Sequence, residues 1–257
     1  ARNRGVEFAS ADVIVFVDAD VVLTTDARRQ LEAHFADPTL TAVIGAYDDR
    51  ARASLVSDYR NLLHHHVHNA SAGPSPTFWT GIGAVRRAAF VAAGGLLSAW
   101  EDIEDVEFGL RLTEAGKRIL LDPKIQGTHL KVWTPRSMFK TDVFGRAVPW
   151  SRLLLSGRVK KDRLNLTLAH RTAAAGVALM VVGLAGALLW PGLLWLASVG
   201  AVAFLLASRD ALATFCRLRG PLFALGTLPW HALHYVAALT GYAIVRFSRR
   251  VKEGECA

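Results

Sequence analysis

The chain has 257 residues, long enough for one sizeable domain and a smaller region, and its formal net charge is +8. Its 52% content of hydrophobic residues is high for a purely soluble protein, and these residues concentrate after position 171. The two cysteines, Cys216 and Cys256, exclude a disulfide framework and a cysteine metal cluster, which favours a reduced, cytosol-facing chain. The sequence opens with ARNRG, without an initiating Met or a signal peptide, so we expect the natural protein to begin earlier.

The part of the chain before residue 150 alternates between helical and extended patterns, which predicts an α/β fold. Helices are expected at 2–10, from the Thr25-Asp26 cap to 35, and at 55–68, 87–93 and 104–115. Strands are expected at 13–17, 40–46, 78–85 and 118–122; the first should be buried, and Pro123 should end the last. Residues 69–77 (NASAGPSPT) should form a loop.

Two carboxylates follow the first strand, because VIVFV at 13–17 runs directly into Asp18-Ala19-Asp20. Side chains at i and i+2 of an extended segment point the same way, so these carboxylates would repel each other without a cation between them. Mg²⁺ and Mn²⁺ bind one or two carboxylates together with phosphate oxygens. The pattern therefore predicts a divalent metal that carries a diphosphate. The alternative is a strand end with two solvated acids.

A second acidic group opens the predicted helix in WEDIEDVEFGLRLTEAG, residues 100–116. Acids at the N-terminus of a helix are favoured by its dipole, so capping alone is one interpretation. Five acids within seven residues exceed what a cap needs, and a carboxylate near an acceptor hydroxyl can take its proton. The preceding GIGAVRRAAFVAAGG contributes small residues, among them Gly81 and Gly83, that allow close approach by a ligand.

No side chain from 172 to 208 is charged, and one helix of that length would measure about 55 Å against a membrane core of roughly 30 Å. The Trp190-Pro191-Gly192 break therefore predicts two spans, about 172–189 and 192–208. A further uncharged stretch predicts a third span at about 221–245, interrupted only by His231 and His234. The alternative is a set of buried helices in a large soluble core.

Basic residues before the first span predict that the N-terminal domain is cytoplasmic, on a multi-pass protein of the inner (plasma) membrane. They are Arg152, Arg158, Lys160, Lys161, Arg163 and Arg171. A loop with Arg209, Arg217 and Arg219 should lie on the same side, whereas the side of the C-terminus stays open. Residues 134–171 are expected to form a basic, amphipathic interface segment. Anionic lipid then explains the positive charge, and nucleic acid is not expected as a partner.

The order of four segments resembles family 2 glycosyltransferases of the GT-A fold. These segments are ARNRG, the strand with Asp18-Ala19-Asp20, TFWTGIGAVRRAAFVAAGG and EDVEFGLRLTEAG. The resemblance covers about residues 1–130, and the membrane segments after it are similar to the membrane-bound branch of the family. It implies a GT-A catalytic domain at 1–133 that lacks its first strand-helix unit, a 134–171 interface segment and a 172–257 transmembrane region. A chain so truncated is expected to be impaired as it stands.

The resemblance also implies roles for individual residues. Asp18 and Asp20 would coordinate Mg²⁺ or Mn²⁺ on the nucleotide diphosphate, and Asp105, preceded by Glu104, would be the catalytic base of an inverting displacement. Glu101-Asp102 is a rival for that pair. His129 is a further candidate ligand of the metal or diphosphate, because such enzymes often use a late His. The Gln-x-x-Arg-Trp motif of processive synthases is absent from the sequence, which lowers the expectation of a polymerase.

Other residues have a functional and a structural interpretation. The candidates for binding donor or acceptor are Arg2, Asn3, Trp79, Gly81, Gly83, Arg86 and Arg87. The arginines would meet phosphate or lie on the surface, and Trp79 would stack on a sugar or anchor the core. His64, His65, His66 and His68 lack a third ligand at the spacing of a zinc site, so packing near Trp79 or contact with acceptor is preferred.

These interpretations predict a hexosyltransferase of cell-envelope polysaccharide that moves a sugar from a nucleotide-sugar to a lipid-linked or glycan acceptor at the cytoplasmic membrane face. A hydroxyl acceptor is favoured over a phosphate because a phosphate hardly needs a base. One alternative is a haloacid-dehalogenase-like phosphatase with Asp18 as the nucleophile, although a suitable Lys is lacking before Lys117. Another is a non-catalytic membrane scaffold derived from a glycosyltransferase.

Overall fold

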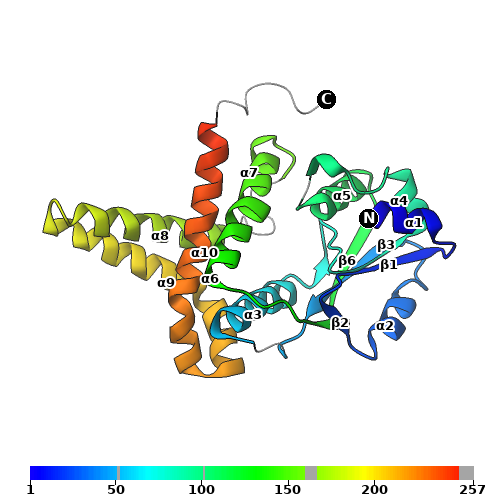
Figure 1. Cartoon of the computed structure of the whole chain (residues 1–257), viewed down its shortest axis with the longest axis horizontal. Helices are drawn as coiled ribbons and strands as arrows, with labels where there is room; N and C mark the ends of the chain where they lie inside the picture. The colour runs from blue at the N-terminus through cyan, green and yellow to red at the C-terminus, as the bar shows by residue number, and fades with distance from the viewer. Residues whose placement is uncertain (51–52, 101, 160–166, 249–257) are drawn as a thin grey trace. The chain divides into compact units, whose positions relative to one another are not determined.

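The computed structural model describes residues 1–50, 53–100, 102–159 and 167–248. The chain divides into two compact units, Ala1–Trp133 and Thr134–Ala257, which are described separately (Figure 1). Several residues used above lie outside the described part, namely Glu101, Lys160, Lys161, Arg163 and Cys256.

The N-terminal unit alternates helices and strands as predicted. Its helices are α1 (Arg2–Phe8), α2 (Ala27–His34), α3 (Leu55–Ala70), α4 (Arg87–Ala92), the 3₁₀ turn η1 (Ser98–Trp100) and α5 (Glu104–Glu114). Its strands are β1 (Val13–Val17), β2 (Val21–Leu23), β3 (Leu40–Tyr47), β4 (Gly73–Pro74), β5 (Ile82–Arg86) and β6 (Arg118–His129). The strands form one sheet in the order β1-β5-β3-β6-β2, and β4 pairs with β6 outside this path. β3 and β6 are parallel, whereas the pairs β1–β5, β3–β5, β2–β6 and β4–β6 are antiparallel.

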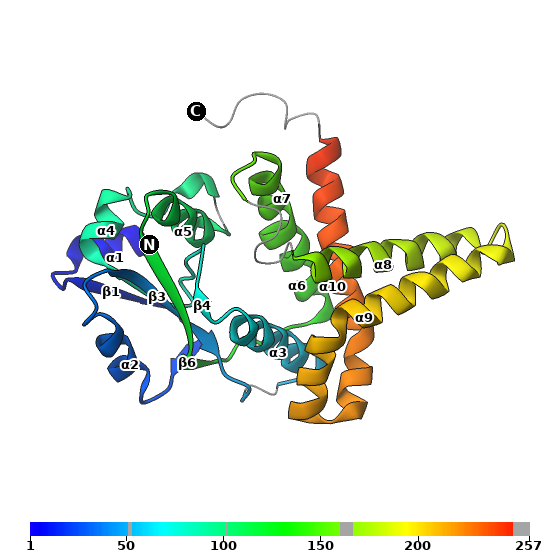
Figure 2. The same ribbon diagram turned by 180° about the vertical axis from the view of Figure 1, so that it is seen from behind.

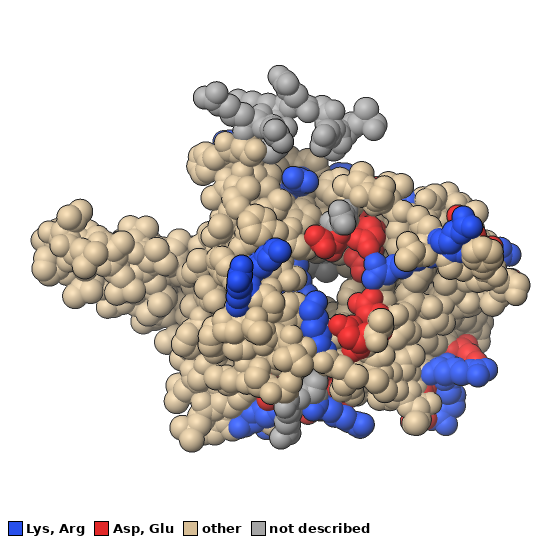
Figure 3. Space-filling model, viewed as in Figure 1, with Lys and Arg blue, Asp and Glu red and all other residues tan. Residues whose placement is uncertain are grey.

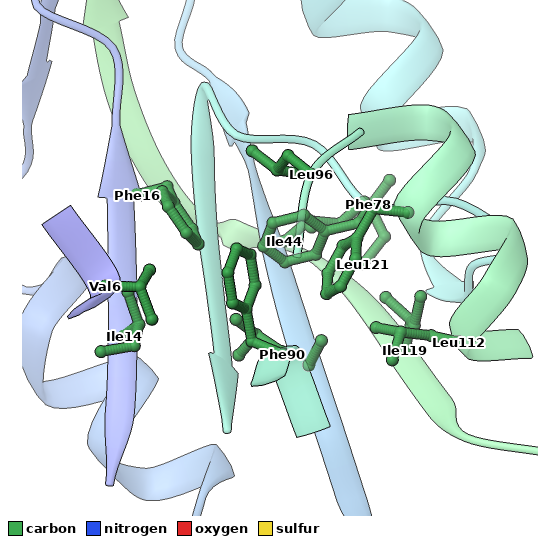
Figure 4. Packing of buried hydrophobic residues seen from close by; sticks show 13 residues of the cluster. Val6, Ile14, Phe16, Ile44, Phe78, Phe90, Leu96, Leu112, Ile119 and Leu121 are labelled. Carbon is green, nitrogen blue, oxygen red and sulfur yellow. The ribbon is translucent and has the colours of Figure 1, made fainter. Parts of the chain in front are cut away.

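Helices cover both faces of this sheet. On one face, α1, α4 and α5 pack through a cluster in which Phe78 and Phe90 each contact both Phe16 and Phe108. Figure 4 shows Phe16, Phe78 and Phe90 within this cluster. On the other face, α2 packs through Ala27 and Leu31, and the ring of Tyr47 closes that cluster at the end of β3. Because both faces are covered, the ends of the strands are where polar side chains can gather.

Several sequence predictions were wrong in the strands. The strand expected at 78–85 begins only at Ile82, as β5. β1 is an edge strand whose burial alternates, with Val15 47% and Val17 39% exposed, so it is not buried throughout. Asp18 to Val21 form a turn instead of an extended segment, because the Val21 amide donates to the Asp18 carbonyl at 3.0 Å. The last strand, β6, does not end at Pro123 but runs on to His129.

The second unit is helical. Its first elements are α6 (Pro135–Lys140), the π-helical turn η2 (Thr141–Ala147) and α7 (Val148–Leu155). They are followed by α8 (Leu168–Gly186), the 3₁₀ turn η4 (Pro191–Leu193), α9 (Leu194–Arg219) and α10 (Pro221–Phe247). Among the described residues, the three segments 168–186, 191–219 and 221–247 are helices long and apolar enough to cross a membrane. The predicted break at Trp190-Pro191-Gly192 separates the first two.

The second of these helices is longer than expected. Arg209, Arg217 and Arg219 lie within α9 and not in a loop, because the helix continues to Arg219 before Gly220 turns the chain at a φ of +88°. Figure 2 shows α8 and α9 side by side as a hairpin. Their backbones approach closely, since a Cβ on Gly176 would lie 2.7 Å from the Gly200 carbonyl oxygen.

The interface segment is joined to α10 by polar and small residues. The buried Asp142 of η2 lies 3.2 Å from the His234 Nδ1 of α10 and 3.9 Å from an Arg146 nitrogen. Gly241 of α10 packs against Ala147 so tightly that a Cβ would lie 2.4 Å from the Ala147 side chain. A role of this segment at a membrane surface remains a prediction.

Candidate active site

The turn after β1 brings Asp18 and Asp20 to the end of the sheet at which β5 begins and β6 ends. The Asp18 amide donates to the Gly81 carbonyl at 3.2 Å, next to the first residue of β5. The Asp20 carbonyl accepts from the Leu130 amide at 2.7 Å, and Val21 is paired with His129 in the β2–β6 ladder. Backbone pairing thus fixes both acids against segments far away in the sequence.

Arg2 connects Asp18 to the start of α5. One guanidinium nitrogen donates to Asp18 Oδ1 at 2.9 Å, and the other donates to Glu104 Oε1 at 2.5 Å. The three side chains are 38%, 33% and 21% exposed, so the pair of contacts is only partly screened by solvent. The two acidic motifs recognised in the sequence therefore meet at one place, with Arg2 between them.

His129 lies against Asp20. Its Nε2 is 3.5 Å from Asp20 Oδ2, and its Nδ1 is 2.9 Å from Asn61 Oδ1. The ring is stacked on Tyr47, with centroids 4.3 Å apart and planes 4° from parallel. Burial lowers the pKa of His129 although Asp20 opposes this shift, so the imidazole tends to stay neutral near pH 7. A neutral imidazole offers one lone pair to a metal ion.

Asp105 is held by the segment before β5. Its Oδ2 accepts from the Thr80 amide at 2.9 Å and from the Thr80 hydroxyl at 3.1 Å, and its Oδ1 accepts from the Val106 amide at 2.7 Å. Burial raises the pKa of Asp105, and the three hydrogen bonds oppose that shift because they stabilise the carboxylate. A carboxylate with a raised pKa is a stronger base than an ordinary surface aspartate.

The other acids at the start of α5 have different surroundings. Glu107 is 1% exposed and pairs with Arg111, which also donates to the Gly95 carbonyl at 2.6 Å. This pair anchors α5 to the turn after α4. Asp102 is exposed and takes a φ of +72° just before the helix. The acidic run thus includes a structural ion pair as well as the two carboxylates, Glu104 and Asp105, that lie at the site.

An aromatic group lies beside the carboxylates. Tyr47 makes an edge contact with Trp79 at 4.7 Å between centroids, and His68 contacts the same indole at 4.5 Å. Burial, together with Asp18, Asp20 and Asp105, raises the pKa of the Tyr47 hydroxyl, so it remains a proton donor. Burial lowers the pKa of His68 to about 4. A sugar-stacking role for the half-buried Trp79 stays a prediction.

Three candidates from the sequence, Arg86, Arg87 and Asn3, form contacts within the fold itself. Arg86 donates to the backbone carbonyls of Phe35, Asp37 and Leu40, and it is paired with Val13, at the opposite end of β1 from Asp18. Arg87 follows it, and its amide donates to Asp12 at that same end. The Asn3 amide group is bonded in both directions to the Leu96 backbone, at 2.8 and 2.9 Å. β5 thus carries Arg86 and Arg87 away from Asp18, and phosphate binding by these two residues stays a prediction.

Gly81 and Gly83 lie near the site for reasons of packing. A Cβ on Gly81 would lie 2.3 Å from the Trp79 ring, and one on Gly83 would lie 2.3 Å from the Trp79 carbonyl oxygen. Because neither glycine has a Cβ, the ring and the backbone of Trp79 can pack against them. Thr80, Asn61 and Tyr47 were missed by the sequence reasoning, and only the polar Asn61 on the apolar face of a predicted helix gave any signal.

Among the residues that the structure describes, no group of three or more His, Cys, Asp or Glu side chains is gathered closely enough to hold a metal ion alone. A Mg²⁺ or Mn²⁺ ion on a diphosphate needs only one or two carboxylates from the protein. Asp20 and His129 already form a pair, and Asp18 lies in the same turn. Oxygen and imidazole nitrogen are donors that Mn²⁺ accepts, so these residues fit such an ion.

Residues 1–91 match the family model described as glycosyl transferase family 2. The matched residues lie within the N-terminal unit, Ala1–Trp133. A comparison with curated proteins finds no match. Among solved structures, a mannosyltransferase from Pyrobaculum calidifontis in complex with GDP-Man and Mn²⁺ is similar, with a TM-score of 0.52 and 19% identity. The match covers 93% of this chain and 64% of that protein, so the chain spans less than two thirds of its relative.

The N-terminal unit has a GT-A-type α/β fold, and a helical unit with long apolar helices follows it. This outcome contradicts the dehalogenase-like phosphatase alternative, which needs a different fold. Figure 3 shows acidic side chains gathered on the visible face of the GT-A unit. The projecting end of the α8–α9 hairpin shows no charged side chain in that view.

Proposed function

We propose that this family 2 glycosyltransferase moves a hexosyl group from a nucleotide-diphosphate sugar to an acceptor hydroxyl, with inversion at the anomeric carbon. The observation that carries the proposal is the Arg2 bridge, which joins Asp18 at the end of β1 to Glu104 at the start of α5. A bound metal ion and a catalytic base both use carboxylates, and Arg2 holds two carboxylates close together here. Donor chemistry and acceptor chemistry would then occur on opposite sides of Arg2.

Asp20 and His129, together with Asp18, would hold a Mg²⁺ or Mn²⁺ ion. When bound, this ion would neutralise the charge of the departing nucleotide diphosphate. The neighbouring mannosyltransferase was solved with GDP-Man and Mn²⁺, which supports this class of donor and metal for the present chain. Arg2 lies beside Asp18, where its guanidinium can contact a phosphate oxygen once the carboxylate binds the ion.

Asp105 is proposed as the base. Thr80 holds one carboxylate oxygen through two hydrogen bonds, so the carboxyl plane is fixed before substrate arrives. The acceptor hydroxyl would give its proton to Asp105 as its oxygen bonds to the anomeric carbon, and the bond from that carbon to the diphosphate oxygen would break. The pKa of Asp105, raised by burial, suits proton uptake.

The acceptor is proposed to be a lipid-linked molecule or a glycan of the cell envelope at the cytoplasmic face of the inner membrane. The long apolar helices 168–186, 191–219 and 221–247 support attachment to a membrane, and the basic residues near them favour anionic lipid. A base positioned for a hydroxyl supports a hydroxyl over a phosphate as the acceptor group. Nucleic acid has no role in this proposal.

The test measures nucleotide release by the full natural protein in membranes, from UDP-, GDP- and dTDP-sugars with Mg²⁺ or Mn²⁺. The variants are Asp18→Asn, Asp20→Asn and Asp105→Asn, and Asp12→Asn is the matched control because Asp12 is exposed just before β1. We expect metal-dependent release from one donor, retained in the control and reduced about 10²–10⁴-fold in Asp105→Asn. No release from any donor with acceptor-bearing membranes would contradict the proposal and favour a scaffold.

A further inference from the structure

We propose that Asn61 is a positioning residue that fixes His129 as the tautomer with its proton on Nδ1, so that Nε2 and Asp20 form a preorganised half-site for a divalent cation. This inference rests on the proposed function, because the cation is the one that the donor diphosphate would carry. Neither the family match nor the similar structure assigns a role to Asn61, which is 3% exposed on α3.

The orientation of the Asn61 amide follows from its two partners. Its Nδ2 lies 3.4 Å from the carbonyl oxygen of His129, and its Oδ1 lies 2.9 Å from the Nδ1 of the same residue. A backbone carbonyl only accepts hydrogen bonds, so the NH₂ group of Asn61 must face it. Oδ1 therefore faces the ring, and since Oδ1 also only accepts, Nδ1 must carry the proton.

The tautomer decides what His129 presents to Asp20. With the proton on Nδ1, Nε2 carries a lone pair, and it lies 3.5 Å from Asp20 Oδ2. Two acceptor atoms then face each other without a proton to share, an arrangement that a cation between them would stabilise. Octahedral ligands about 2.1 Å from an ion lie about 3 Å apart, so only a small closure is needed.

The surroundings hold the half-site in place from three directions. The β2–β6 ladder pairs Val21 with His129, and the Leu130 amide donates to the Asp20 carbonyl, so the two backbones are fixed. Tyr47 stacks on the imidazole and prevents the ring from tilting. The backbone pairing and the Tyr47 ring do not determine which imidazole nitrogen is protonated. The hydrogen bond from Nδ1 to Asn61 does. Such outer partners are worth about 10- to 100-fold in metal affinity.

The experiment uses the full natural protein in detergent and two readouts that need no transfer. Long-range ¹H–¹⁵N spectra report the tautomer of His129, whose signal is assigned by its loss in His129→Gln. Electron paramagnetic resonance of unbound Mn²⁺ reports the affinity for that ion. The variants are Asn61→Leu, which removes both hydrogen bonds, and Asn61→Asp, which keeps an acceptor for Nδ1. Ser57→Ala is the control, because Ser57 is buried on the same helix and bonds to Trp133 instead.

We expect the natural protein to show His129 with its proton on Nδ1, and Asn61→Leu to lose that preference and bind Mn²⁺ about 10- to 100-fold more weakly. Asn61→Asp should stay within about threefold of the natural protein, since a carboxylate also accepts from Nδ1. Ser57→Ala should leave both readouts unchanged. Thermal unfolding of each variant shows whether it is folded. If Asn61→Leu does not fold, the spectrum of Asn61→Asp decides the question of the tautomer.

Three results would overturn the inference: a proton on Nε2 in the natural protein, unchanged Mn²⁺ affinity in Asn61→Leu, or equal loss in Asn61→Leu and Asn61→Asp. The last would mean that Asn61 only packs. These results are separable from the proposed function. Metal-dependent transfer with normal Mn²⁺ binding by Asn61→Leu would keep the transferase and reject the role of Asn61. If the tautomer and the Mn²⁺ affinities are as expected but no donor supports transfer, the role of Asn61 is kept and the transferase is rejected.

Discussion

Asp105 accepts two hydrogen bonds from Thr80, at 2.9 Å from the backbone amide and at 3.1 Å from the hydroxyl, across 25 residues of sequence. The contact ties the start of α5 to the segment that leads into β5. Because the backbone amide is one of the donors, the position of the carboxylate depends on the fold itself as well as on a side chain. The hydroxyl is the part that a substitution can remove.

The substitution Thr80→Val removes the hydroxyl and preserves the shape of the side chain. A hydrogen bond to a carboxylate stabilises its ionised form, so its loss should raise the pKa of Asp105 further above its usual range. A base works when ionised, so activity is lost as pH falls through that pKa. The acidic limb of the pH–rate profile should therefore move to higher pH in Thr80→Val and stay in place in Thr80→Ser. If the acidic limb is unchanged in Thr80→Val, the group whose ionisation produces that limb is not Asp105.

Arg2 forms ion pairs with both Asp18 and Glu104. The substitution Arg2→Ala should lower the free energy of unfolding by about 1 kcal/mol, a modest cost because the three side chains are partly exposed. It should also increase the gain in stability from excess Mn²⁺, since the ion no longer competes with a guanidinium for Asp18. Thermal unfolding with and without Mn²⁺ measures both effects.

The matched control for Arg2 is Arg28→Ala. Arg28 pairs with Glu32 on the surface of α2 at 2.8 Å, and its side chain is 88% exposed. Its removal should leave the stability nearly unchanged and the response to Mn²⁺ unaltered. Equal responses to Mn²⁺ in the two variants would place the ion away from Asp18.

Two glycines in helices should respond to alanine with opposite signs. A Cβ on Gly109 of α5 would lie 1.9 Å from the Phe78 amide nitrogen, so Gly109→Ala should destabilise the protein by about 3 kcal/mol. Gly5 of α1 has no atom within 4 Å of such a Cβ, so Gly5→Ala should stabilise by up to about 1 kcal/mol. Denaturant unfolding compares them, and a tolerated Gly109→Ala would show that α5 is not seated against residues 77–78.

Within the helical unit, Gly183 should be intolerant of a side chain. A Cβ there would lie 2.4 Å from the Ala197 amide nitrogen, so Gly183→Leu should separate α8 from α9 and cost about 1–3 kcal/mol. The neighbouring Val182 is 58% exposed, and Val182→Leu should be close to neutral. The two variants are compared by thermal unfolding in detergent, where equal midpoints would contradict this packing.

Local patterns were sufficient to predict most elements of the N-terminal unit. The strand at 13–17 has the bounds expected, and the helices beginning at Leu55 and Glu104 begin where expected. Apolar periodicity predicts such elements because the polarity of each residue follows whether its own position is buried. The convergence of Asp18 with Glu104 was expected only from a family resemblance, since no local rule brings these positions together.

The errors arose where pairing between distant strands decides the outcome. The strand β6 continues past Pro123 because the β3–β6 register shifts between Ile44–Leu121 and Ala46–Gln126, which leaves Pro123 in an irregular stretch. A proline is tolerated there because no ladder hydrogen bond requires its nitrogen. Likewise, only the pairing of β1 with β5 shows which end of the sheet Arg86 occupies.

The close contact of Gly176 with Gly200 has a consequence for sequence change in the helical unit. In lipid, apolar side chains gain nothing by leaving their surroundings, so neighbouring helices must be held by close backbone approach instead. Tolerance to mutation should therefore be the reverse of that in the N-terminal unit. Large exposed residues such as Leu188 and Leu189 should vary freely, whereas the glycines at the helix contact should not accept a side chain. In this hairpin, the glycines, which have no side chain, therefore determine where the two helices pack against each other.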